Sequence, residues 1–118
     1  MLTATQPTQL QEEANKWVSQ LLAYVDRITE MRNKFYKWAA GKTDREVLVQ
    51  IEHYHNQFHI QLINIHDLKH SIKTHLKQLN LMPELDQTGP HQHLKEQFDF
   101  LVKDLDSLTA EFKGFISE

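Results

Sequence analysis

The sequence contains no cysteine among its 118 residues. This absence excludes disulfide bonds, thiolate zinc sites and cysteine nucleophiles, and with them the small secreted scaffolds that depend on disulfides. Glycine and proline are also scarce, with three residues of each. Because these two residue types mark most turns, we expect the chain to fold into a few long elements.

An excess of positive charge is missing as well. The 13 Lys and Arg are outnumbered by 16 Asp and Glu, which gives a formal net charge of −3 with histidine neutral. We therefore expect no nucleic-acid binding, since a phosphate backbone is neutralised by a basic surface. No apolar run reaches the roughly 18 residues of a membrane span, and residues 1–9 lack the features of a signal peptide. We expect no membrane contact and a cytoplasmic location.

The sequence is instead rich in hydrophobic periodicity. Three segments have apolar residues at alternating steps of three and four, the pattern of helices that pack along their whole length. In the second segment two of these positions are polar, His55 and Lys69, and we interpret them as residues that fix the register. The three sets are Leu10, Ala14, Trp17, Leu21, Tyr24, Ile28, Met31, Phe35 and Trp38; Leu48, Ile51, His55, Phe58, Leu62, Ile65, Lys69, Ile72, Leu76 and Leu79; and Leu94, Phe98, Leu101, Leu105, Leu108, Phe112 and Phe115.

Turn signals separate these segments. Gly41 suits the left-handed conformation that ends a helix, and Thr43 with Glu46 three residues later forms a capping-box pattern. We predict one all-α domain over residues 1–118, an up-down-up antiparallel bundle of three long helices with left-handed, coiled-coil-like packing. The predicted helices span about 8–39, 44–81 and 90–116. Their wide apolar stripes are also compatible with a homodimer.

Six of the eight histidines lie between residues 53 and 75. On the predicted second helix, five residues fall within an arc of about 60° and form what we call the histidine stripe: Glu52, His55, His59, His66 and His70. The simplest interpretation is a border between the apolar and solvent faces, because imidazole has an apolar body and a polar tip.

A metal site is an alternative interpretation of the histidine stripe. Pairs four residues apart, His55 with His59 and His66 with His70, can share one ion on neighbouring turns of a helix. Glu52-x-x-His55 also matches half of the Glu-x-x-His device of di-iron bundles, although the chain has no second copy. The candidate ligands are therefore the five stripe residues, for a functional metal, an adventitious divalent metal or haem.

A third interpretation starts from His66-Asp67-Leu68-Lys69-His70-Ser71. This segment resembles the His-x-Leu-Lys-Gly-x motif of histidine phosphotransfer domains, which are helical bundles of similar length. The resemblance implies that His66 is phosphorylated on an exposed helix face and passes the group to an aspartate of a receiver domain. Lys69 would help to hold the phosphoryl group, and His70 stands where the family has glycine.

No arrangement typical of an enzyme is recognisable: the sequence has no evident serine nucleophile, Gly-rich phosphate loop or paired carboxylates. We therefore expect a non-catalytic helical-bundle module without a resident cofactor, which binds a protein partner or a second copy of itself. We also expect stability to fall as the pH drops through the range near 6, because stripe histidines that are held neutral at the helix border resist protonation.

Overall fold

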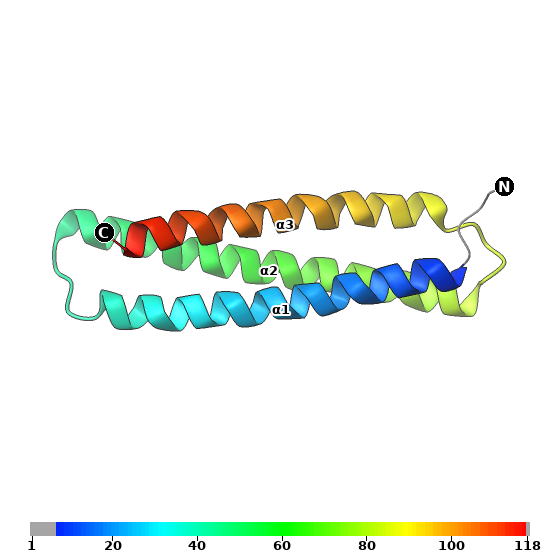
Figure 1. Cartoon of the computed structure of the whole chain (residues 1–118), viewed down its shortest axis with the longest axis horizontal. Coiled ribbons are helices and arrows are strands. Elements are labelled where there is room, and N and C mark those ends of the chain that lie inside the picture. The colour runs from blue at the N-terminus through cyan, green and yellow to red at the C-terminus, as the bar shows by residue number, and fades with distance from the viewer. Residues whose placement is uncertain (1–6, 118) are drawn as a thin grey trace.

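The computed structural model describes residues 7–117 and is a bundle of three α-helices, as predicted. They are α1 (Pro7–Ala39), α2 (Arg45–Leu81) and α3 (Thr88–Ile116), and the described residues contain no strand. The helices run up, down and up in an elongated rod of 61 × 22 × 17 Å (Figure 1). The loop between α1 and α2 lies at one end of this rod, and the loop between α2 and α3 lies at the other.

The helix boundaries agree with the prediction to within two residues. Gly41 follows α1 with a φ of +83°, which confirms its left-handed conformation. The predicted cap of α2 at Thr43 is wrong by one residue. Asp44 caps this helix instead, since its Oδ1 accepts a hydrogen bond of 2.9 Å from the backbone N–H of Glu46. The short acidic side chain nearest the first turn thus satisfies one of the free N–H groups there.

An aromatic cluster closes the end of the bundle at which α1 joins α2. Phe35 of α1 lies 5.8 Å from Phe58 of α2 and 5.5 Å from Phe112 of α3, measured between ring centroids. The rings meet edge to face, an arrangement that adds about 0.5–1.5 kcal/mol per pair to the burial of apolar surface. All the residues predicted for the core of the first and third helices are buried or half-buried.

The predicted core of the second helix is wrong at Leu48 and His55, which are exposed, and its other positions are buried or half-buried. One of its two columns is buried as expected: Phe58, Ile65, Ile72 and Leu79. The other predicted column is only half-buried, with Leu62 and Leu76 packed against the core. A fully buried column that was not predicted lies on the opposite flank and is formed by Tyr54, Gln61, Leu68 and His75. Consequently His55 is exposed and Lys69 is only half-buried, and neither fixes the register from inside the core.

The physical reason is that α2 packs against both α1 and α3, so either flank of its central column is able to enter the core. The predicted flank carries Leu62 and Leu76, whereas the buried flank carries the polar Gln61 and His75. Hydrophobicity alone therefore identified the half-buried flank and missed the fully buried one.

None of the described helices has an apolar stretch long enough to cross a membrane. The cytoplasmic location stays a prediction from the sequence.

Candidate functional site

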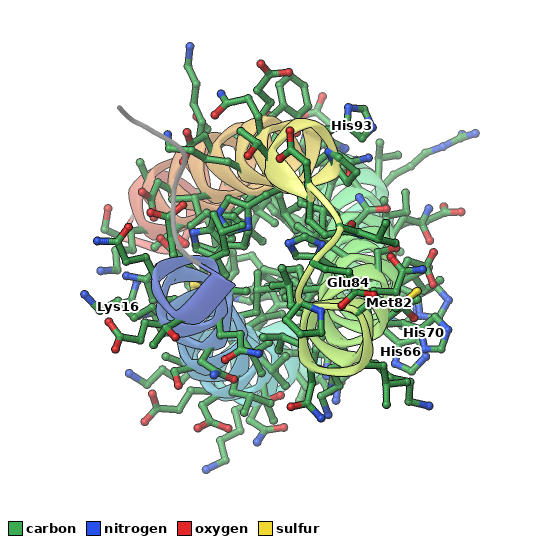
Figure 2. The ribbon with its side chains drawn as sticks, turned by 90° about the vertical axis from the view of Figure 1, so that its right-hand side faces the viewer. Lys16, His66, His70, Met82, Glu84 and His93 are labelled. Atoms are coloured by element: carbon green, nitrogen blue, oxygen red, sulfur yellow. The ribbon has the colours of Figure 1, made fainter. Side chains whose placement is uncertain are left out.

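The histidine stripe lies on the solvent face of α2. Its five residues, Glu52, His55, His59, His66 and His70, are all exposed rather than half-buried. The stripe turned outward because the buried face of α2 is centred on the opposite flank. Figure 2 shows His66 and His70 together on the outer side of α2, directed away from the other two helices.

The structure does not gather the stripe into a metal-binding cage. Among the described residues, no group of three or more His, Asp or Glu side chains is placed to hold a metal ion. His55 faces α1, where its Nδ1 lies 2.9 Å from the hydroxyl of Tyr36. A metal at the two-histidine pairs of the stripe stays a prediction.

The residues of the phosphotransfer motif lie on different sides of α2. His66 is exposed, as a phosphorylated histidine has to be, whereas Lys69 is half-buried and Asp67 lies on the flank toward α3. Phosphorylation of His66 also stays a prediction.

A buried chain of titratable groups lies elsewhere, near the loop between α2 and α3. His75 of α2 and His91 of α3 are 3% and 5% exposed. The distance between His75 Nε2 and His91 Nδ1 is 2.9 Å, and His91 Nε2 lies 2.8 Å from Oε1 of Glu13 on α1. Trp17 stacks on the His91 ring with 4.6 Å between ring centroids. We call Glu13, His91 and His75 the buried histidine chain.

The hydrogen bonds of this chain dictate which ring nitrogens carry protons. An ionised Glu13 only accepts, so His91 Nε2 donates to it. In a neutral His91 the other nitrogen, Nδ1, then accepts, and His75 Nε2 must be its donor. His75 Nδ1 is left without a proton, and it is buried without a hydrogen-bond partner. Burial, and to a lesser degree the facing His91, lower the pKa of His75 below its ordinary value.

Sequence reasoning missed the buried histidine chain, because His75 falls outside the histidine stripe. A signal was nevertheless present. His75 lies one heptad after Leu68 and two after Gln61, so the three share one column of α2. Reading that column as the core places an imidazole in the interior, where it needs a polar partner.

Besides the buried histidine chain, the structure has a groove of about 570 Å³ between α2 and α3 on the outside of the bundle. Its apolar lining includes Leu68, Leu101 and Phe100, of which the first two are buried and the last is 68% exposed. Its acidic lining is formed by Asp67, Glu96 and Asp104, and no Lys or Arg is among its lining residues in the described part of the chain.

Phe100 is the most exposed of the large apolar side chains described. Ile60 on α2 is 46% exposed and lies one turn before the groove residue Asn64, so it extends apolar surface along the same flank. His93, on the outer side of α3 in Figure 2, borders the groove at the end nearest the buried histidine chain. The labelled Lys16 projects from α1 on the opposite side of the molecule.

Comparison with known proteins gives no relative: no protein-family model, no curated protein and no solved structure matches this chain.

Proposed function

We propose that this chain is a non-catalytic helical module whose α2–α3 groove binds an amphipathic helix of another protein, with Lys or Arg beside its apolar face. The observation that supports this most strongly is the exposed Phe100 inside an acid-lined groove. A phenyl ring that is 68% exposed gains little from the fold of the free chain, and aromatic side chains dominate the energetics of protein interfaces.

The groove has the dimensions of a helix-binding site. Residues 93–104 of α3 rise about 16 Å at 1.5 Å per residue, which accommodates about three turns of a partner helix. A helix laid between α2 and α3 would cover Phe100 and complete a four-helix arrangement, the common way in which bundles bury an apolar groove.

The charge of the groove selects the partner's chemistry. Asp67, Glu96 and Asp104 are exposed carboxylates, and no cation lines the groove to neutralise them in the described chain. Basic side chains that flank the apolar face of a partner helix would pair with these carboxylates, whereas acidic ones would be repelled.

The test is a binding titration with two synthetic helical peptides of 18 residues. Both carry Leu and Phe on one face, and the polar face is lysine in the first and glutamate in the second. We expect the lysine peptide to bind the wild-type protein, as measured by fluorescence anisotropy. Its affinity should fall by at least about tenfold for the Phe100→Ala protein. The triple variant Asp67→Lys, Glu96→Lys, Asp104→Lys should prefer the glutamate peptide.

The matched control is Leu22→Ala, which removes an exposed apolar side chain of α1, 47% exposed and outside the groove. Equal binding by wild type, Phe100→Ala and Leu22→Ala would refute the proposal, as would a lack of binding by the wild type. Light scattering on the free proteins separates self-association: a wild-type dimer that Phe100→Ala converts to a monomer would identify a second copy as the occupant instead.

A further inference from the structure

We infer that the buried histidine chain is a proton-operated latch, which holds the α2–α3 loop end of the bundle closed when both imidazoles are neutral and releases it when either takes up a proton. This goes beyond the proposed function, because it concerns groups buried inside the bundle rather than the groove and needs no partner.

The placement of the three groups suits a latch. Each of the three helices contributes one group: Glu13 from the start of α1, His75 from the end of α2 and His91 from the first turn of α3. His75 and His91 flank the connection between α2 and α3 and lie opposite the end closed by the aromatic cluster. The hydrogen bonds between them therefore tie together all three helices at this end.

Among the described residues, the closed arrangement offers no hydrogen-bond acceptor for the N–H group that a further proton would create. If His75 is protonated, its Nδ1 becomes an N–H donor. If His91 is protonated instead, its Nδ1 donates to His75 Nε2, and the proton of His75 must move to Nδ1. In both cases an N–H appears at His75 Nδ1, the buried atom that has no partner in the structure.

A buried donor without an acceptor is strongly disfavoured, and opening this end of the bundle lets water accept from it. Protonation of both histidines is still more unfavourable, because two N–H groups would then face each other across the 2.9 Å between His75 Nε2 and His91 Nδ1.

The surrounding charges are few. From α1, Glu13 faces His91 with a carboxylate that is 48% exposed. From α3, Lys95 lies one turn after His91, bonded at 2.9 Å to Asp99 and attracted to Glu13. From α2, the titratable group that contacts His91 is His75 itself. No anion therefore stands beside His75 Nδ1 to accept the added proton's hydrogen bond in the described structure.

The test is amide hydrogen exchange of the full chain at pH 7.5 and pH 5.5, corrected for the intrinsic exchange rates and performed in EDTA so that no metal bridges the imidazoles. We expect protection at the end of α2 and the start of α3 to fall at least about tenfold more than protection at Phe58 and Phe112. In the double variant His75→Leu, His91→Phe this local difference should vanish, since neither replacement side chain titrates. The phenyl ring at position 91 keeps the stacking on Trp17.

The matched control is His66→Gln, which removes an exposed histidine of the same helix and should leave the local difference unchanged. Because the double variant needs to fold for this comparison, a measurement on the wild type accompanies it. Nitrogen-15 spectra of the histidine rings at pH 7.5 should show both His75 and His91 protonated at Nε2. A His75 protonated at Nδ1 at that pH, or a loss of protection spread evenly over the bundle, would overturn the latch.

Discussion

His75 and His91 lie 2.9 Å apart, nitrogen to nitrogen, in the interior of a bundle whose remaining core is almost entirely apolar. Each comes from a helix that ends or begins at the same loop. A buried polar pair of this kind stabilises the fold only while both rings keep the protonation state that their hydrogen bonds require.

The first prediction concerns pH. The pKa of His75 is lowered in the folded chain, so between that value and its ordinary value of about 6.5 the unfolded chain binds more protons. The contribution of His75 to stability is therefore fully present above about pH 6.5 and is lost as the pH falls below it. We expect the melting temperature to drop between pH 7.5 and 5, as measured by circular dichroism.

Substitutions of the histidines test which of them cause this pH dependence. Replacing the exposed His59, His66 and His70 with Gln should leave most of the drop in place, whereas His75→Leu with His91→Phe should reduce it. The sequence attributed the pH effect to the histidine stripe, and a drop that disappears with the stripe variants would restore that attribution.

The second prediction compares two phenylalanines. Phe58 is fully buried in the aromatic cluster, and Phe100 is 68% exposed in the groove. Phe58→Ala should lower the free energy of unfolding by about 3–5 kcal/mol, because it leaves a cavity in the core. Phe100→Ala should change it by less than about 0.5 kcal/mol. Urea denaturation measures both, and similar losses in the two variants would contradict the burial described here.

The third prediction compares two glycines. Gly41 has a φ of +83°, which side chains with a Cβ rarely adopt, so Gly41→Ala should cost about 1–2 kcal/mol. Gly114 lies within α3 with open space where a Cβ would be placed, so Gly114→Ala should increase stability by up to about 1 kcal/mol. Chemical denaturation should therefore show the free energy of unfolding shifting in opposite directions in the two variants. Shifts in the same direction would contradict the helix ends described here.

The fourth prediction concerns metal at the histidine stripe. His55 contacts the hydroxyl of Tyr36, whereas His66 and His70 are exposed and project together into solvent. We expect zinc to bind weakly and only to the second pair, with binding lost in His70→Gln and kept in His55→Gln. Calorimetry on protein without a histidine tag checks this. Tight binding that needs both pairs would support a functional metal site.

The sequence was sufficient for most of the fold. The three heptad patterns and Gly41 located the helices to within two residues, because helix length and helix ends are set by local interactions. The burial of Gln61 and His75 on the other flank of α2 was beyond it, since that burial depends on the neighbouring helices.

The same limit explains the sites. The histidine stripe was a local pattern and was found, but its position relative to α1 and α3 was not. The contact of His75 with His91, and of His91 with Glu13 across 78 positions, arises from tertiary packing alone. The groove likewise joins residues of α2 and α3 that no local pattern connects. Exposure of Phe100 was equally invisible, because it depends on what the other helices leave uncovered.

The claim that the α2–α3 groove is the binding surface is tested most directly by mapping amide chemical shifts of the chain while the lysine peptide is added. We predict that the largest changes cluster around Phe100, at residues 93–104 and at the groove-lining residues of α2, which are Asn64, Asp67, Leu68 and Ser71. Changes centred on His66 and His70 on the outer side of α2, or on α1 around Lys16, with the groove unaffected, would contradict it.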